Sequence, residues 1–203
     1  MKLSRQINNN LRFLVAETGS QLSSLQDYLQ NPTATLARRI LDRGGYAYNL
    51  MLRIHEGCRS QVIKSRNSET ETASLRSIES VATDLEHIAG LCRESIQQLK
   101  QMQNRRCPGA NACGYMLDRV AQGLDRVETA ITQNDTRLAL KIGRIKSRMD
   151  NTSQKLVKKY TAGLKRKKHT EDLVAGLFLV HSIEQMGDAM RNISSAIISA
   201  NLG

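Results

Sequence analysis

Aromatic residues, proline and long apolar runs are all scarce in this chain of 203 residues. Aromatics make up 3% of it, with no Trp and two Phe, so the core must be built from Leu, Ile, Val, Ala and Met. With only two Pro, the composition favours helices over strands. The sequence contains no run of about 18 uninterrupted apolar residues, so no transmembrane helix is predicted. The polar first residues lack the apolar core of a secretion signal, and we therefore expect a cytoplasmic protein.

Cysteine is also scarce, and its spacing excludes the common zinc and redox motifs. The four cysteines are Cys58, Cys92, Cys107 and Cys113, and the last two flank five residues rather than the two of a C-x-x-C motif. Reduced thiols in a cytosolic protein are the simplest interpretation. A thiol switch or a metal site around Cys107 and Cys113 is the alternative.

Acidic residues are fewer than basic ones, 19 Asp and Glu against 30 Lys and Arg, so the formal net charge is +11 and the sequence pI is about 9.8. Such a balance favours anionic partners. Nucleic acid is disfavoured because base-stacking aromatics are few and no helix-turn-helix or zinc-finger pattern occurs. Acidic protein or the head groups of an anionic membrane are the expected partners of a basic turn late in the chain, and a merely solvated turn is the alternative. This anion- or partner-binding segment comprises Lys158, Lys159, Lys165, Arg166, Lys167 and Lys168.

The chain divides into two similar halves at a segment that contains Gly, Pro and Cys, residues 104–114. At an offset of 102 residues, Ile40 of the first half matches Ile142 of the second. After a short difference in loop length the offset becomes 98, and Glu86 then matches Glu184. The phase of the apolar residues and the positions of the turns also agree, which indicates an internal repeat.

Each half is expected to contain three helices joined by short turns. Thr33 and Asp135 stand at N-cap positions before the second helix of each half. Long helices with short connections form antiparallel bundles, so we predict an all-α fold of two tandem three-helix bundles, residues 1–103 and 115–203. The alternative is one continuous coiled coil, which the breaks at the turns disfavour. The predicted helices span residues 7–29, 33–65, 71–103, 115–132, 135–164 and 170–202.

The last predicted helix carries a polar stripe inside an apolar segment, residues 177–193. Glu184 and Asp188 are four residues apart and therefore share one face of a helix, with His181 one turn before them. Carboxylates in apolar surroundings are costly unless they are paired, hydrogen-bonded or bound to a metal. The stripe is therefore the main candidate for a functional site.

These features together resemble the PhoU family. The run Glu-x-x-Gly-Asp-x-x-x-Asn-Ile that begins at Glu184 is similar to the family's Asp-Leu-Glu-Arg-Ile-Gly-Asp motif and the Asn-Ile after it, and residues 84–90 are its degenerate echo. The first half departs from the pattern, because Gly90 replaces the second acid and Tyr48 stands where the second half has Asp150. The resemblance thus identifies the chain as a divergent two-repeat member.

The resemblance implies that these acids bind a divalent metal or iron on the bundle surface. The implied ligands are Glu184, Asp188 and Asp150 in the second half and Glu86 in the first. Carboxylate oxygens suit such ions, and His181 could add an imidazole nitrogen. The alternative is ion pairing or hydrogen bonding of the acids. The cations considered for this are Arg191, Lys141, Arg144 and Arg148.

By the same resemblance the protein is a non-enzymatic regulator or adaptor in phosphate transport or phosphate signalling. Its partner would be a phosphate transporter or a phosphate-sensing kinase, with a homodimer and peripheral membrane association as further expectations. Two alternatives stay open: a basic helical module that binds nucleic acid or an anionic membrane, and a carboxylate–metal enzyme. Enzymatic motifs are missing, since the chain has no glycine-rich phosphate loop, no H-E-x-x-H and no nucleophile elbow.

Overall fold

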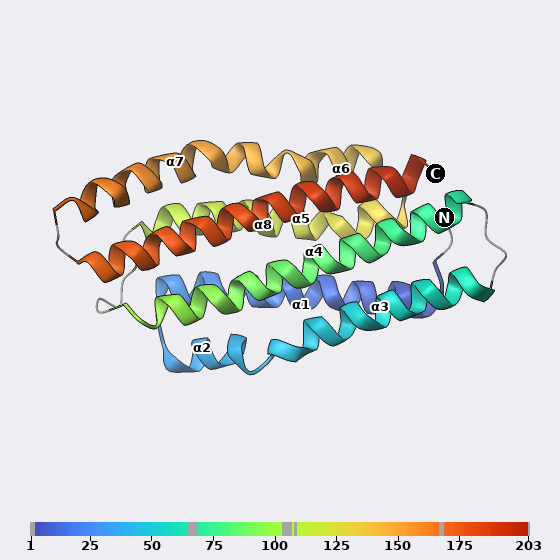
Figure 1. The fold of residues 1–203 in the computed structure, drawn as a ribbon, viewed down its shortest axis with the longest axis horizontal. Helices are drawn as coiled ribbons and strands as arrows, with labels where there is room; N and C mark the ends of the chain where they lie inside the picture. The colour runs from blue at the N-terminus through green and yellow to red at the C-terminus, as the bar shows by residue number, and fades with distance from the viewer. Residues whose placement is uncertain (1–2, 65–68, 103–106, 108, 167–168, 203) are drawn as a thin grey trace.

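The computed structural model describes residues 3–64, 69–102, 107, 109–166 and 169–202, and all regular structure in them is α-helical. The helices run along the long axis of an elongated bundle (Figure 1). This confirms the predicted all-α fold class. The helices are α1 (Arg5–Gln30), α2 (Ala34–Leu41), α3 (Gly44–Lys64), α4 (Glu69–Leu99), α5 (Ala110–Thr132), α6 (Thr136–Gly143), α7 (Ile145–Leu164) and α8 (Thr170–Leu202).

The middle helix of each half is interrupted, so α2 and α3 replace one predicted helix and α6 and α7 replace the other. The C-cap residues of α2 and α6 are Asp42 and Arg144, which are 102 positions apart. Glycine lies beside both interruptions, and its low helix propensity favours a break there. The two halves therefore repeat even their irregularity, which supports the internal repeat.

The two predicted N-caps are confirmed. The Thr33 side-chain oxygen accepts a hydrogen bond from the Leu36 amide at 3.2 Å and begins α2. One Asp135 oxygen accepts from the amides of Arg137 at 2.8 Å and Leu138 at 3.0 Å and begins α6. Each cap satisfies amides that have no partner inside the helix and stabilises it by about 1 kcal/mol.

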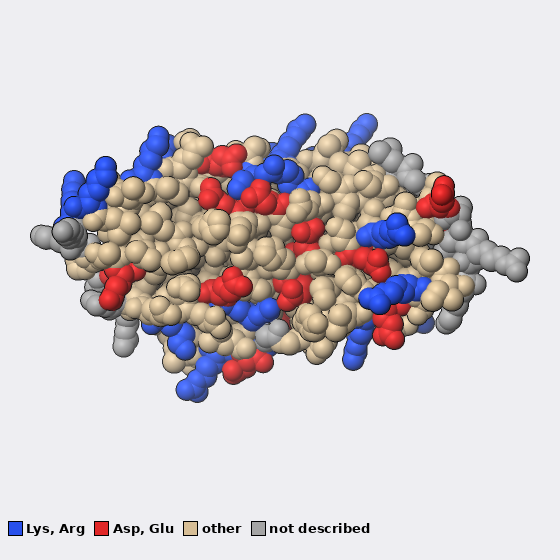
Figure 2. All heavy atoms as spheres, viewed as in Figure 1, with Lys and Arg blue, Asp and Glu red and all other residues tan. Residues whose placement is uncertain are grey.

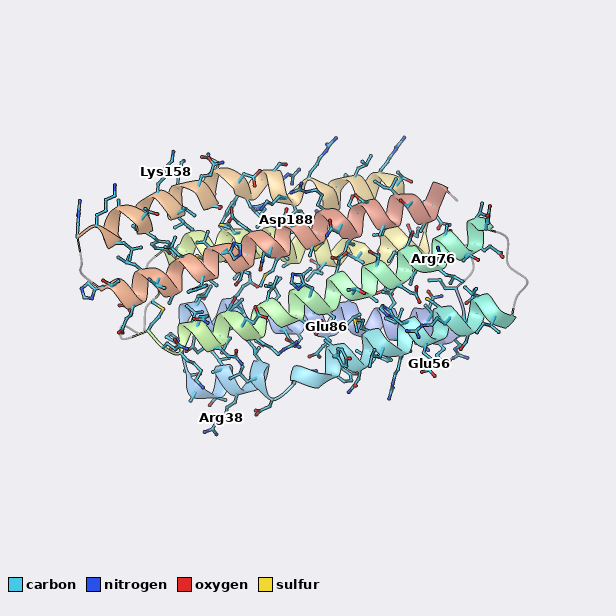
Figure 3. The ribbon with its side chains drawn as sticks, in the orientation of Figure 1. Arg38, Glu56, Arg76, Glu86, Lys158 and Asp188 are labelled. Carbon is cyan, nitrogen blue, oxygen red and sulfur yellow. The ribbon has the colours of Figure 1, made fainter. Side chains whose placement is uncertain are left out.

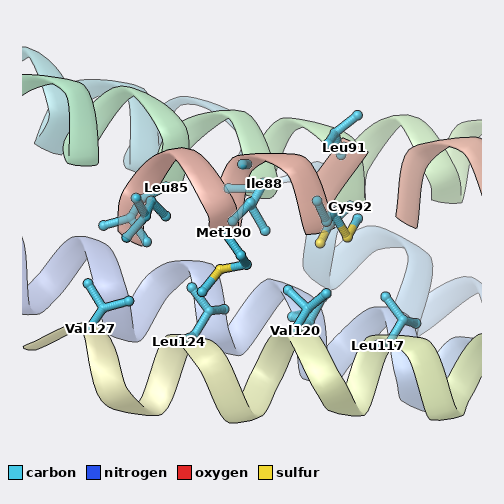
Figure 4. Packing of buried hydrophobic residues seen from close by; sticks show 14 of the residues in the cluster. Leu85, Ile88, Leu91, Cys92, Leu117, Val120, Leu124, Val127 and Met190 are labelled. Atoms are coloured by element: carbon cyan, nitrogen blue, oxygen red, sulfur yellow. The ribbon is translucent and has the colours of Figure 1, made fainter. Parts of the chain in front are cut away.

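One hydrophobic core runs through both halves. α4 and α8 lie side by side along the middle of the molecule, and α1 packs against α5 (Figure 1). In Figure 4, Met190 of α8 points between buried side chains of α4 and α5. Those labelled are Leu85, Ile88, Leu91 and Cys92 of α4 and Leu117, Val120, Leu124 and Val127 of α5. Since burial of apolar surface drives folding, the halves share one source of stability.

The predicted division at residues 104–114 stays a prediction, and residues 104–106 and 108 lie outside the described part of the chain. Within the described helices, none combines the length and the apolar character needed to span a bilayer.

Candidate functional site

The polar stripe of α8 faces α7, where its carboxylates meet other polar side chains. Asp188 Oδ2 lies 3.2 Å from the Lys146 ammonium, and Asp188 Oδ1 lies 2.5 Å from Arg191 Nη2. The Ser153 hydroxyl donates to Glu184 Oε1, and Lys146 also donates to the Glu184 carbonyl oxygen at 3.3 Å. We call these five residues the α7–α8 polar cluster; Asp188 is labelled on α8 in Figure 3.

Positive charge from the protein itself compensates Asp188. The pair with Arg191 confirms one of the cations considered from the sequence, whereas Lys146 was missed. The Lys146 side chain is only 17% exposed, so it is held in place by packing between α7 and α8. Its sequence signal was its position four residues before Asp150, which places both on one face of α7.

The implied metal ligands are only partly brought together. Asp150 is partly buried on α7, and Glu184 and Asp188 lie on the facing helix. Yet no three His, Cys, Asp or Glu side chains among the described residues are grouped so that they could hold one ion. Because the Lys146 ammonium lies against Asp188, this arrangement fits an ion pair better than a metal ion. Metal binding in solution stays a prediction.

The fourth implied ligand, Glu86, lies in a separate network in the first half (Figure 3). Glu86 Oε1 is 3.1 Å from Arg93 Nη2, and Arg93 Nη1 lies 3.5 Å from Gln21 Oε1. Gln21 Nε2 donates to Glu17 Oε1 at 2.9 Å, and Arg43 Nη2 lies 2.5 Å from Glu17 Oε2. This Glu17–Arg43 network ties α1, α4 and the break between α2 and α3 together, which is a structural arrangement.

The two motif segments meet at the contact between α4 and α8. Asn192 Nδ2 donates to Asp84 Oδ1 at 3.4 Å across this contact. Burial raises the pKa of the Asp84 carboxyl, while the Asn192 hydrogen bond and the nearby His87 oppose that rise. Asp84 therefore serves as a link between the halves.

The predicted basic segment lies at the end of α7. Lys158, Lys159, Lys165 and Arg166 are exposed there, while Lys167 and Lys168 fall outside the described residues. Figure 3 shows Lys158 on the outer side of α7. The segment is thus available to an anionic partner, as the prediction requires.

Beside this segment, α7 and α8 enclose a groove of about 400 Å³ that sequence reasoning missed. Its exposed apolar residues include Phe178, whose side chain is 50% exposed. The signal was available in the spacing of Val174, Phe178 and His181 at i, i+4 and i+7, which puts them on one face of α8. The residues that line this α7–α8 groove are Val157, Val174, Leu177, Phe178, His181 and Glu184.

The cysteines are free and buried. Burial raises the pKa of Cys58 and of Cys92 to about 12. The thiols of Cys107 and Cys113 hydrogen-bond to each other and to the Tyr160 hydroxyl. The bond from Cys113 lowers the pKa of Cys107, whereas the bond to Cys107, together with burial, raises the pKa of Cys113. Cys107, Cys113 and Tyr160 are buried in the core, whereas the lysines next to Tyr160 on α7 are exposed.

Comparisons with known proteins agree with the fold and with the motif. The family model described as PhoU domain matches residues 115–197, the half that keeps both acids of the motif. The crystal structure of PhoU from Pseudomonas aeruginosa superimposes with a TM-score of 0.86 at 16% identity, over 96% of this chain and 94% of that chain. The phosphate transport system regulatory protein PhoU from Streptococcus pneumoniae gives a TM-score of 0.74 at 14% identity, over 96% and 92%. None of the curated proteins compared with this chain matches its sequence. The predicted resemblance is confirmed.

Proposed function

We propose that this protein regulates phosphate transport, because its second half matches the PhoU domain and the chain has the fold of PhoU proteins over nearly its whole length. The observation that carries the proposal is the PhoU domain at residues 115–197 within a fold that matches PhoU over nearly the whole chain. The role proposed is that of a non-enzymatic adaptor at the cytoplasmic side of a phosphate transporter or a phosphate-sensing kinase.

The shared core and the ion pairs of the surface support an adaptor role. The shared core holds all the helices in one elongated body, so that a partner docked on one face meets a fixed arrangement of side chains. Asp188 is paired with Lys146 and Arg191, and Glu86 is paired with Arg93, and no step of the proposed role passes through a metal ion. Self-association and contact with a membrane surface stay predictions.

The test is deletion of the gene in its own organism, with phosphate uptake measured in phosphate-rich and phosphate-poor medium. We expect the deletion to change the uptake rate in at least one medium and a plasmid copy of the gene to restore it. Unchanged uptake in both media, with the protein present in the parent strain, would refute the proposal. A leucine or amino-acid uptake assay in the same strains controls for general effects on growth.

A further inference from the structure

The surface of α7 and α8 that forms the groove differs from the matching surface of α3 and α4 in the first half, and the fold does not require this difference. Positions 157, 174 and 178 are Val, Val and Phe in the second half, and these side chains are 37%, 37% and 50% exposed. The offsets of 102 and 98 align them with His55, Arg76 and Ser80 of the first half. At these three positions the same helix pair carries polar residues in one copy and exposed apolar residues in the other.

His55, the first-half residue at the position of Val157, is hydrogen-bonded within its own half. Its Nε2 lies 3.1 Å from the Glu79 carbonyl oxygen and 3.2 Å from Thr83 Oγ1, which joins α3 to α4. Thr83 aligns with His181, which lines the α7–α8 groove instead. Contact of exposed apolar side chains with water is unfavourable, and a partner that covers them removes this cost. Exposed apolar side chains that line a groove are therefore typical of an interaction site.

The charge beside the groove identifies what would cover it. Lys158 of α7 and its C-cap residue Lys165 lie about 80–100° round the helix from Val157. Both therefore flank the groove on the outer side of α7. Figure 2 shows an uncharged area over the first half of α8, with Lys and Arg towards the outer end of α7 and acidic side chains nearer the middle of the molecule. An occupant should therefore be apolar on one side and acidic on the next.

We propose that the α7–α8 groove docks an acidic amphipathic helix of a partner protein. Its apolar residues at i, i+3, i+4 and i+7 would fill the space around Phe178, and its acidic residues would meet Lys158 and Lys165. The long aliphatic stems of the two lysines can lie along the bound helix while their charges meet its carboxylates. This inference rests on the adaptor role proposed above and names the chemistry of the adaptor's partner.

A second copy of this chain and a lipid surface fit less well. The chain carries a net charge of +11, so two basic ends would repel each other at a shared groove. A bilayer surface needs apolar side chains that project from a convex face. Here they line a hollow between two helices, which suits the ridge of side chains on another helix.

The test measures binding of a fluorescein-labelled peptide of about 18 residues, five helical turns, with Leu at i, i+3, i+4 and i+7 and Glu at most other positions. We expect the wild type to bind it and Phe178→Ser, which installs the first-half residue, to weaken binding at least tenfold. The matched control is Phe13→Ser, since Phe13 is the other Phe and is similarly exposed, at 55%, on α1. It should bind like the wild type.

The contribution of charge is tested in the same assay with two variants of equal net charge. Lys158→Glu/Lys165→Glu should weaken binding at least tenfold at low salt, whereas Lys155→Glu/Lys159→Glu should change it by less than threefold, because Lys155 and Lys159 lie about 160° round α7 from Val157. Circular dichroism checks that each variant is folded. Equal losses in both variants would show general attraction and would overturn the proposal.

Two further results would overturn the proposal. One is the absence of peptide binding by the wild type, or binding that Phe178→Ser leaves unchanged. The other is binding to phosphatidylglycerol vesicles that Phe178→Ser abolishes while the peptide does not bind, which would assign the groove to a membrane. Since peptide binding is measured on purified protein, its failure is distinguishable from the failure of the phosphate-uptake test.

Discussion

The buried carboxylate of Glu17 makes Arg43 an unusually sensitive position. The Glu17 side chain is 2% exposed and is compensated by Arg43, which is itself 45% exposed, and by Gln21. Removal of one partner of a fully buried ion pair costs about 3–5 kcal/mol. The solvent contact of Arg43 and the remaining Gln21 hydrogen bond reduce this, so we expect Arg43→Ala to lower the free energy of unfolding by about 2 kcal/mol. In a chain of this size that is a fall in Tm of about 4–8 °C.

The assay is urea unfolding followed by circular dichroism, with Arg191→Ala as the matched control. Arg191 pairs with Asp188, but both side chains are about half exposed, so this loss should cost no more than about 1 kcal/mol. The double variant Glu17→Gln/Arg43→Ala should recover much of the stability, because a neutral amide no longer needs the cation. Equal effects of the two single variants, or a double variant no more stable than Arg43→Ala, would refute the reasoning.

Three more outcomes are expected. Gly123→Ala should destabilise the protein by about 1–2 kcal/mol in urea unfolding, since an added Cβ would lie 2.2 Å from Ile145 Cδ1, whereas Gly19→Ala, with nothing within 4 Å, should be neutral or stabilising. Burial raises the pKa of Asp84, so the native state binds that proton more tightly than the unfolded state does, and the protein gains stability as pH falls through the raised pKa towards about 3.9; Asp84→Asn should flatten the pH dependence in this range, and an unchanged slope would contradict this. If metal binds α8, elemental analysis should find less of it in Glu184→Ala/Asp188→Ala than in the wild type, and equal content would leave the ion-pair interpretation alone.

The fold was predictable because its signals are local. Apolar residues recur at helical spacing, and Thr33 and Asp135 cap helices through hydrogen bonds two or three residues along the chain. The breaks at Asp42 and Arg144 were not predicted because glycine only weakens a helix and packing decides whether it ends. The repeat, in contrast, is visible as matched phase over the whole length of each half.

The site was less predictable because its partners come from a different helix. The sequence indicated that Asp188 would be paired, hydrogen-bonded or bound to a metal, and Arg191, one turn away, could be named as a possible partner. Lys146 lies 42 positions earlier and reaches Asp188 only through the packing of α7 on α8. Likewise, the apolar character of Phe178 says nothing about whether it is buried, and a Phe in a helix is usually taken for core.

A duplicated fold offers a physical reason for the division between the halves. Both copies must bury apolar residues at matching helix positions, since they share one core across α4 and α8. Their outer helix pairs are free of that constraint: α3 and α4 are bonded to each other through His55, while α7 and α8 leave Phe178 exposed beside lysines. One copy can thus act as support while the other keeps the motif and the apolar groove. The triple variant Val157→His/Val174→Arg/Phe178→Ser carries the first-half residues at these positions. It should remain folded, with a free energy of unfolding in urea within about 1 kcal/mol of the wild type, and yet lose peptide binding. Loss of both together would mean that the groove residues are core.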